Sequence, residues 1–473
     1  MELDYKELGF RCGLEIHQQL EGKKLFCSCP TEIRKDKPDF TVTRRLRASA
    51  GETGEVDKAA KYEQAKQKLF VYQGYQDSTC LVELDEEPPH ELNKNALKTA
   101  VQVILMLNAR PVEFIQYMRK VVIDGSNTSG FQRTALVGRN GYIELENKKK
   151  IHIPGIYLEE EACQVIKREK EYDIYNLSRL GIPLLEIATD PDLSTPQEAM
   201  EAAAKIGMIL RSVEGMKRGI GTIRQDVNIS ISGQAKVEIK GFQEYKSIPK
   251  VIEYELKRQL ELIKKGKPIT SEVRNAKPDF TTEFLRPNPG ADRMYPETDV
   301  PIIKIDFSGI SAGKTLAEKE KELMMAYNLT PELAKELLRK KMDIGLFVNK
   351  YKNIKPSFIA ETLITTPKEI KARFKLDVNP IPHVDEIFRR LDAGEIGRKA
   401  VLEILVKIAK GEKVDYSQYA LADESNLKED IKKVISKNPG ASIGALMGMV
   451  MDKHRGKVDG KKVMELIKMY LQK

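Results

Sequence analysis

The chain has 473 residues, 41% hydrophobic and 32% charged, which is too long for one typical core and predicts several domains. A formal net charge of +9 is compatible with a nucleic-acid partner, although it is modest for this length. No apolar leader opens the chain and no apolar run reaches bilayer length, so we expect a cytoplasmic protein rather than a membrane or secreted one.

The first predicted strand, residues 13–20 ("GLEIHQQL"), carries two polar residues that need an explanation. Side chains alternate along a strand, so Leu14 and Ile16 point to one face while Glu15 and His17 point to the other. A half-buried strand needs polar groups on its wet face, but not these two in particular. Taken alone, the pattern leaves open a solvated surface or part of a metal site.

Five cysteines are too few and too scattered for a disulfide framework. Cys27, Cys29 and Cys80 could hold a structural zinc together with a fourth ligand, and the alternative is a set of free buried thiols. Cys12 and Cys163 lie in apolar contexts and are predicted to belong to the core.

Helices are predicted at residues 93–108 and 195–213, within a region that also contains short strands. In the second helix, Thr195 is a natural N-cap, Pro196 occupies the first turn and Glu198 completes a capping box.

A loop of small residues lies between basic residues at positions 119–133 ("RKVVIDGSNTSGFQR"). Its glycines permit close backbone approach, and its N–H groups can cradle an anion, although the spacing is not that of a Walker A loop. We assign four of its residues to nucleotide binding: Gly125, Ser126, Asn127 and Ser129. The alternative is an ordinary polar turn.

Acidic residues gather on further predicted strands. Residues 157–161 ("YLEEE") contain three consecutive carboxylates, and Glu186 lies inside the apolar run 179–187. A carboxylate in such a run must find a cation or suffer a large desolvation penalty.

Residues 221–240 predict a hairpin with one apolar and one densely charged face, with a turn at residues 232–234. Arg224, Asp226 and Asn228 share the polar face of its first strand, and Glu238 and Lys240 follow on the second. A sheet facing water is the common explanation for one hairpin. Acids donated to one concave face by several strands favour an oxygen-rich Mg²⁺ site.

From about residue 311 the pattern becomes helical. Thr330 and Thr366, each followed by proline, are predicted helix starts, and the last 70 or so residues form a small helical unit. Its basic residues, at 453–462, are either a solvated face or a contact for an RNA backbone. The fold class is therefore α+β, with a helical C-terminal part.

Several segments together resemble the archaeal glutamyl-tRNA(Gln) amidotransferase E subunits, and more distantly the bacterial B subunits. They include "GLEIHQQL", "KKLFCSCP", "TCLVELDEEPPH", "IDGSNTSGFQRTAL", "YLEEEA", "LSRLGIPLLEIAT", "KRGIGTIRQDVNISI" and "MYPETDVP". The resemblance implies a cradle-shaped, glutamine-synthetase-like α/β domain at 1–306, a helical domain at 307–410 and a tRNA-binding tail at 411–473.

The resemblance also implies an activity. The E subunit is a ligase that uses ATP and Mg²⁺ to phosphorylate the side chain of glutamate on misacylated Glu-tRNA(Gln). Ammonia from an asparaginase-like D subunit then displaces the phosphate, within a heterotetramer of two D and two E subunits. The alternatives are a B-type subunit that works with A and C partners, or a tRNA-binding scaffold without catalysis.

The family's metal pattern falls on four residues of this sequence: Glu15, His17, Glu160 and Glu186. We add Glu159 as a metal ligand, and Asp226 and Lys120 as catalytic residues. Contacts with phosphate or the acceptor carboxylate are predicted for Lys120, Arg179, Arg224 and Lys240. In the E family a further domain is inserted before "TTEFLRP", and here it is missing near residues 274–280.

Overall fold

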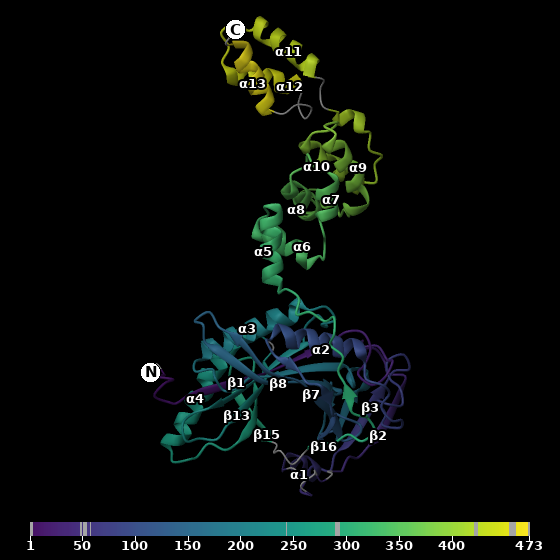
Figure 1. The fold of residues 1–473 in the computed structure, drawn as a ribbon, viewed down its shortest axis with the longest axis vertical. Helices are drawn as coiled ribbons and strands as arrows, with labels where there is room; N and C mark the ends of the chain where they lie inside the picture. Colours follow the sequence, from purple (N-terminus) through teal and green to yellow (C-terminus); the bar gives the residue numbers. More distant parts are fainter. Residues whose placement is uncertain are drawn as a thin grey trace. The chain divides into compact units, whose positions relative to one another are not determined.

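The computed structural model describes residues 3–47, 50, 54–56, 58–242, 244–288, 294–420, 424–453 and 460–471. The chain forms two compact units, Met1–Thr315 and Leu316–Lys473 (Figure 1). The first unit is mixed α/β and the described part of the second is helical, which confirms the α+β class. Among the described residues, no helix is long and apolar enough to span a bilayer.

An 11-stranded sheet dominates the first unit. Its strands follow the order β15-β14-β13-β12-β1-β11-β8-β7-β6-β16, and β4 also pairs with β7. Neighbouring strands are antiparallel except for β13 and β14. The bounds are β1 (Arg11–Gln19), β4 (Arg110–Pro111), β6 (Met118–Val121), β7 (Phe131–Glu144), β8 (Lys150–Glu160), β11 (Pro183–Ala188), β12 (Ile223–Ser230), β13 (Val237–Phe242), β14 (Glu272–Ala276), β15 (Thr282–Pro287) and β16 (Met294–Pro296). The predicted first strand and the predicted hairpin are confirmed as β1 and β12–β13.

Two smaller sheets complete the unit. One has the order β2-β3-β10-β9, formed by β2 (Phe40–Arg44), β3 (Leu69–Gly74), β10 (Tyr172–Asn176) and β9 (Gln164–Arg168). The other pairs β17 (Ile303–Lys304) with β5 (Phe114–Ile115). The four-stranded sheet has its own small core, which includes Phe70, Tyr72 and the predicted core residue Cys163.

Three helices pack on one face of the large sheet: α2 (Lys94–Met106), α3 (Pro196–Ser212) and α4 (Ile248–Lys264). Ile104, Ile206 and Ile252, one from each helix, are fully buried in a single core with Leu14 and Ile16 of β1. Because strand side chains alternate, the intervening residues of β1 point away from these helices. A further helix, α1 (Lys58–Ala65), contacts β15.

The N-caps follow the sequence signals. The side chain of Asn93 accepts hydrogen bonds from the N–H groups of Asn95 and Ala96 at the start of α2. Thr195 accepts one from the N–H of Glu198 at the start of α3, as predicted. Such caps satisfy N–H groups that have no partner inside the helix.

Where the sequence predicts a missing domain, the chain turns back at once from β14 to β15. The N–H of Lys277 donates to the carbonyl of Thr281 at 2.9 Å, and the N–H of Phe280 donates to the carbonyl of Lys277 at 2.9 Å. The two strands therefore form a closed hairpin.

The described helices of the second unit build two cores. One is formed by α5 (Leu316–Tyr327), α6 (Pro331–Arg339), α7 (Gly345–Lys350), α8 (Pro356–Phe374), α9 (Ile381–Asp392) and α10 (Arg398–Ala409), and it extends to Tyr419. The other is formed by α11 (Glu424–Lys437), α12 (Ile443–Lys453) and α13 (Gly460–Leu471). The basic turn at 454–459 lies outside the described residues.

The predicted helix start at Thr366 and Pro367 is wrong, because both residues lie inside α8. The helix continues because Leu363, Ile364 and Ile370, on either side of the proline, are buried in the same core. Packing of an apolar face therefore outweighs the hydrogen bond that proline cannot donate.

Candidate active site

Strand register gathers polar side chains on the sheet face opposite the helices. His17 of β1 lies opposite Glu186 of β11 and Arg224 of β12, and Glu15 lies opposite Asp226 of β12. Directly opposite residues share one face of a sheet, so all five side chains point to the same side. The hypothesis of a polar row across several strands is therefore consistent with the fold.

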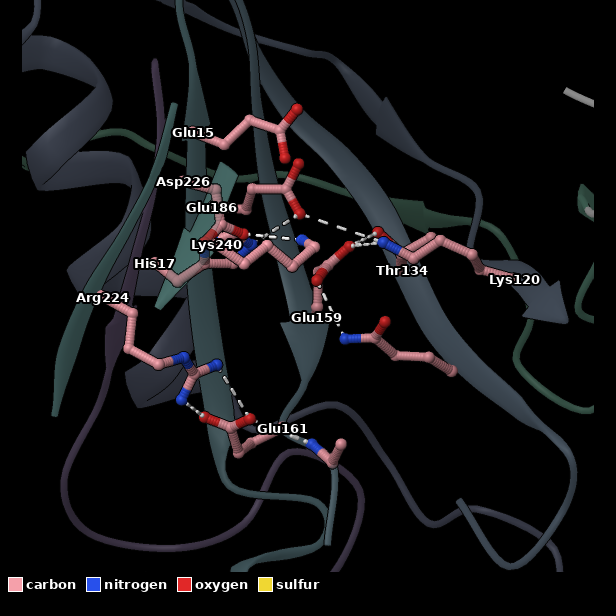
Figure 2. Close-up of polar contacts among 12 residues, drawn as sticks. Glu15, His17, Lys120, Thr134, Glu159, Glu161, Glu186, Arg224, Asp226 and Lys240 are labelled. Carbon is pink, nitrogen blue, oxygen red and sulfur yellow. Dashed lines mark hydrogen bonds and ion pairs between the residues drawn. The ribbon is translucent and has the colours of Figure 1, made fainter. Parts of the chain in front are cut away.

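The acids on this face come within metal-bridging reach of one another (Figure 2). Ligand atoms of Glu15, His17 and Glu186 all lie within 4.8 Å of one another, and so do those of Glu15, Asp226 and Glu238. Nε2 of His17 is 3.3 Å from Oε2 of Glu186. Glu15 therefore belongs to two overlapping groups of ligand atoms.

Two lysines form ion pairs with acids of this face. Nζ of Lys120, on β6, is 2.6 Å from Oε1 of Glu159. Nζ of Lys240, on β13, is 2.7 Å from Asp226 and 2.5 Å from Glu238. In the strand order, Lys240 on β13 and Lys120 on β6 therefore flank the acids of β12, β1, β11 and β8.

Glu159 is held by neutral donors as well as by Lys120. The hydroxyl of Thr134 donates to its Oε1 at 2.5 Å, and Nε2 of Gln132 donates to its Oε2 at 2.9 Å. Both donors come from β7, the strand beside β8. Sequence reasoning missed these two residues, which become visible only when strands β7 and β8 are placed in register.

These side chains line a cavity of about 610 Å³. That volume lies within the range of small-molecule sites. Its wall includes Glu15, His17, Lys120, Glu159, Glu186, Arg224, Asp226 and Lys240, together with Glu63 of α1 and Arg286 of β15.

The acids differ in how readily they ionise. Burial raises the pKa of Glu15, and repulsion from Glu186 and Glu238 raises it further. Burial also opposes ionisation of Glu186, but Lys120, 3.9 Å away, and His17 outweigh it and hold its pKa below the ordinary value. Burial lowers the pKa of His17, but its hydrogen bond to Glu186 reverses this and the net shift is upward.

Two features of the described residues fit a bound cation at Glu15, His17 and Glu186. Glu15 accepts a hydrogen bond from Asn228 at 3.0 Å but forms no ion pair with a described Lys or Arg. Nδ1 of His17 is buried and has no hydrogen-bond partner among the described residues. Carboxylate oxygens are the ligands that Mg²⁺ prefers, and an imidazole can accompany them.

Glu160, predicted to join this group, lies elsewhere. It follows Glu159 on β8, so its side chain points to the opposite face of the sheet. There it is 3.2 Å from Nη1 of Arg133, whose Nε is 2.7 Å from Oε2 of Glu297. Its cation is therefore an arginine of the sheet's other face, and the prediction of Glu160 as a ligand beside Glu15 is wrong in this geometry.

The Gly/Ser loop also lies away from the cavity. Residues 122–124 and Gln132 line the cavity, but Gly125, Ser126, Asn127 and Ser129 do not. The loop's polar groups are used internally: the hydroxyl of Ser126 donates to Asp124 at 2.6 Å, and the hydroxyl of Ser129 donates to the carbonyl of Phe131 at 2.9 Å. A phenylalanine side chain, Phe70, packs against Gly125. The structure does not bring this loop to the acids.

Arg179, another predicted anion contact, instead forms hydrogen bonds with backbone carbonyl groups. Its Nε donates to the carbonyl of Ala162 at 2.7 Å and its Nη2 to that of Cys163 at 2.6 Å. It is not among the residues that line the cavity.

Arg224 does line the cavity, and it is paired with an acid that the site prediction omitted. Its Nη1 and Nη2 donate to the two oxygens of Glu161 at 2.8 and 3.0 Å. Burial opposes ionisation of Glu161, but Arg224 and Arg179 hold its pKa at about 2. The signal was present in the sequence, because Glu161 has the same strand parity as Glu159.

The three cysteines of the zinc hypothesis come together, with a fourth ligand that was not predicted. Ligand atoms of Cys27, Cys29, Cys80 and Glu83 lie within 4.8 Å of one another. Sγ of Cys27 donates to Oε1 of Glu83 at 2.9 Å, and Lys24 lies 3.3 Å from the same oxygen. Hydrogen bonds from Cys27 and Cys29 lower the pKa of Cys80. Thiolates and a carboxylate fit tetrahedral zinc.

Comparison with known proteins gives matches along the chain. Residues 10–311 match the family model of the GatB/GatE catalytic domain, and residues 346–471 match that of the GatB domain. A protein of Methanocaldococcus jannaschii that is named as the E subunit of glutamyl-tRNA(Gln) amidotransferase is 36% identical over all of both chains. Proteins with that name from Thermococcus sibiricus and Archaeoglobus fulgidus are each 33% identical over at least 99% of both chains.

The alignment with the Methanocaldococcus jannaschii protein spans 630 positions, whereas this chain has 473 residues. The relative therefore contains residues without a counterpart here. That they fall near residues 274–280, where β14 leads directly into β15, stays a prediction.

Proposed function

The chain belongs to the family of the GatB/GatE catalytic domain, and from this premise we propose that it is the E subunit of a glutamyl-tRNA(Gln) amidotransferase. In this proposal it phosphorylates the side chain of glutamate on misacylated Glu-tRNA(Gln) with ATP. Ammonia then converts the activated side chain to an amide, which yields Gln-tRNA(Gln).

One observation carries the proposal: Glu15, His17 and Glu186 meet beside Lys120 and Lys240 in one cavity of about 610 Å³. A carboxylate accepts ammonia poorly because oxide would be the leaving group, whereas phosphate leaves readily. Phosphoryl transfer between two anions needs electrostatic screening and positioning more than covalent chemistry. A cavity that offers both acids for a cation and cations for phosphate suits that task.

The proposed reaction has two steps, and residues of this chain neutralise the charges that meet in the first. A carboxylate oxygen of the glutamyl group attacks the γ-phosphorus of ATP, and ADP leaves with the electron pair of the broken P–O bond. Lys120, Lys240 and Arg224 lie where they can neutralise phosphate and acceptor oxygens. Ammonia then attacks the acyl carbon, phosphate departs, and a proton is released from the nitrogen.

Glu15, His17 and Glu186 would hold Mg²⁺, with Glu159 and Asp226 beside them. When bound there, Mg²⁺ would neutralise charge on the phosphate oxygens. The cysteine cluster would hold a structural zinc rather than take part in the reaction, because none of its four residues lines the cavity.

The remaining assignments follow from the family. We propose that the α/β body, up to about residue 306, is a cradle-shaped domain like that of glutamine synthetase. The helical segments 307–410 and 411–473 would grip the tRNA. An asparaginase-like D subunit would supply ammonia within a heterotetramer of two D and two E subunits.

Reconstitution tests the proposal. The purified chain, mixed with the asparaginase-like partner, Glu-tRNA(Gln), ATP, Mg²⁺ and an amide donor, should form Gln-tRNA(Gln). Glu15→Ala and His17→Ala should abolish the ATP-dependent step, and undiminished rates in both would contradict the site. Glu91→Gln, whose side chain is 91% exposed just before α2, is a matched control for loss of a carboxylate.

Two alternatives predict different results. Copurification with A-type and C-type subunits, instead of an asparaginase-like protein, would favour a B-type subunit. A non-catalytic tRNA scaffold would release no phosphate from ATP when Glu-tRNA(Gln) is added, whereas the proposed kinase would.

A further inference from the structure

We propose that Glu161 is a positioning residue that holds the guanidinium of Arg224 against the cavity wall, so that Arg224 binds a two-oxygen anionic group of the substrate. This inference rests on the proposed function and adds a residue and a subsite to it. The anionic group is either the carboxylate of the glutamyl acceptor or a phosphate of ATP, since both present paired oxygens to an arginine fork.

The ion pair between Arg224 and Glu161 is bidentate. Nη1 and Nη2 of Arg224 donate to the separate oxygens of Glu161 at 2.8 and 3.0 Å (Figure 2). Such a pair fixes the plane of the guanidinium as well as its position, and so removes rotamer freedom that a free arginine would lose on binding.

Glu161 is itself fixed by hydrogen bonds to residues other than Arg224. Its side chain is only 2% exposed. Nε2 of Gln19 donates to Oε2 at 2.9 Å, and the N–H of Ala162 donates to Oε1 at 3.2 Å. The carbonyls of Ala162 and Cys163 are anchored in turn by Arg179. The carboxylate is therefore a fixed support, whereas an acid that bound substrate directly would need free oxygens facing the cavity.

Arg224 is the half of the pair that remains accessible. Its side chain is 36% exposed and lines the cavity, opposite His17 in the strand register. A guanidinium has five N–H donors, and within the described part of the chain Glu161 is the acceptor of its hydrogen bonds. N–H groups are thus left over for an anion in the cavity.

The location separates this subsite from the acid groups. Glu15, Glu186, Asp226 and Glu238 would repel an unscreened anion, whereas in the pair of Arg224 and Glu161 the cation is the exposed half, at 36% against 2%. An incoming carboxylate or phosphate therefore meets the positive side of the pair.

Equilibrium binding tests the inference without requiring turnover. Glu161→Gln, Arg224→Gln and the double variant of the full chain are compared with the wild type in three titrations. These use Glu-tRNA(Gln), the neutral-side-chain Gln-tRNA(Gln), and a non-hydrolysable ATP analogue with Mg²⁺. We expect about a tenfold loss of affinity for one anionic ligand in each single variant, equivalent to about 1.4 kcal/mol.

The pattern of loss identifies the anion. Weaker binding of Glu-tRNA(Gln), with Gln-tRNA(Gln) unchanged, assigns the subsite to the acceptor carboxylate. Weaker binding of the ATP analogue alone assigns it to a phosphate. Because Glu161 acts through Arg224, the double variant should bind no more weakly than Arg224→Gln.

Two further variants keep the test sound. Arg224→Lys retains the positive charge but not the paired N–H donors, and should lose the same affinity that is expected for Glu161→Gln. It therefore tests the subsite even if Glu161→Gln folds poorly. Glu255→Gln removes another buried carboxylate, which accepts hydrogen bonds from Arg258 outside the cavity, and should leave all three affinities unchanged.

Unchanged affinities in Glu161→Gln and Arg224→Lys, or additive losses in the double variant, would overturn the role of Glu161. Absence of Gln-tRNA(Gln) formation by the wild type would instead overturn the proposed function. The binding comparison distinguishes the two failures because it does not depend on amidation.

Discussion

The two faces of the sheet at the end of β8 both carry ion pairs, but they differ in the space around them. The front cavity holds Glu159 and Glu161 in about 610 Å³, paired with Lys120 and Arg224. The back cluster, formed by Arg119, Arg133, Glu160 and Glu297, adjoins a void of only about 10 Å³. That void has room for about one water molecule.

The contrast shows that buried charge alone does not mark an active site. In the back cluster the side chains of Arg133 and Glu297 are 7% and 0% exposed, and each finds its partner within the protein. At the front, Nδ1 of His17 lacks a partner and Arg224 remains partly open among the described residues. Nε of Arg119 in the back cluster also lacks a partner among the described residues, so the volume of the cavity, rather than ion pairs or unsatisfied atoms, distinguishes the face that can bind substrate.

The largest expected effect is the loss of activity when an acid of the front cavity is neutralised. Glu186→Gln keeps the shape of the side chain but removes the charge beside His17 and Lys120. We expect the rate of Gln-tRNA(Gln) formation to fall roughly 10³-fold, the scale seen when one preorganised electrostatic group is lost. Single-turnover assays of Gln-tRNA(Gln) formation measure it.

The same variant should leave the thermal midpoint nearly unchanged, since Lys120 retains its ion pair with Glu159 and the glutamine oxygen can still accept a hydrogen bond from His17. A variant that keeps the wild-type rate would place catalysis away from this cavity.

The back cluster should respond in the opposite way. Arg133→Met leaves Glu160 without its buried cation and leaves Glu297 paired with Arg119 alone. We expect the free energy of unfolding to fall by roughly 3 kcal/mol, as when one partner of a buried pair is removed. Denaturant unfolding measures it. The affinity of the folded variant for the ATP analogue should stay that of the wild type, and a selective loss of affinity would assign the back cluster to the site.

Much of the front face was predictable because its residues alternate on two clear strands. Glu15 and His17 on β1, and Asp226 on β12, alternate along their strands with apolar residues that face the core. Strand parity depends on the strand alone, so the sequence was enough to place these side chains on a common face.

The errors fall where contacts depend on pairing across the chain. Three consecutive acids do not reveal which of them faces the cavity, because a shift of one residue exchanges the two faces. Glu160 was assigned by family pattern, and Arg133 on β7 decides its partner. Glu83 lies three residues after Cys80, but only the fold brings both to Cys27, which is 56 residues from Glu83. The Gly/Ser loop is a different case, because its donors are used in local contacts such as that of Ser126 with Asp124, which an Asx-turn pattern could have indicated.

The cysteine cluster differs from the front cavity because it would bind a metal that stabilises the fold without taking part in catalysis. Removal of zinc by a chelator should lower the free energy of unfolding by about 2 kcal/mol, since a ligand that binds only the folded state stabilises it by mass action. Cys80→Ser should show the same loss without the chelator. Metal analysis of the purified protein and thermal unfolding measure both effects.

The wild type should contain about one zinc per chain, as expected for one four-ligand site. Alanine at the isolated, buried Cys12 is the matched control for loss of a thiol, and it should retain the zinc. Absence of zinc from the native protein, with stability unaffected by Cys80→Ser, would contradict the metal assignment.

The smallest expected effect is that of acid acting through Glu297 of the back cluster. Burial opposes ionisation of Glu297, but Arg119 and Arg133 hold its pKa below the ordinary value. An acid with a lowered folded-state pKa contributes stability above its unfolded pKa, near 4.3, and that contribution is lost as the pH falls through the folded-state pKa. Denaturant unfolding of Glu297→Gln and the wild type from pH 6 to pH 3 measures the difference.

Glu297→Gln should be the less stable protein at pH 6, because its neutral side chain cannot balance Arg119 and Arg133. The two stability curves should approach each other toward pH 3, as the wild-type carboxylate takes up its proton. Parallel curves would mean that Glu297 has the same pKa in the folded and unfolded chains. The two arginines would then be balanced by Glu160 and Asp299, the other acids paired with them.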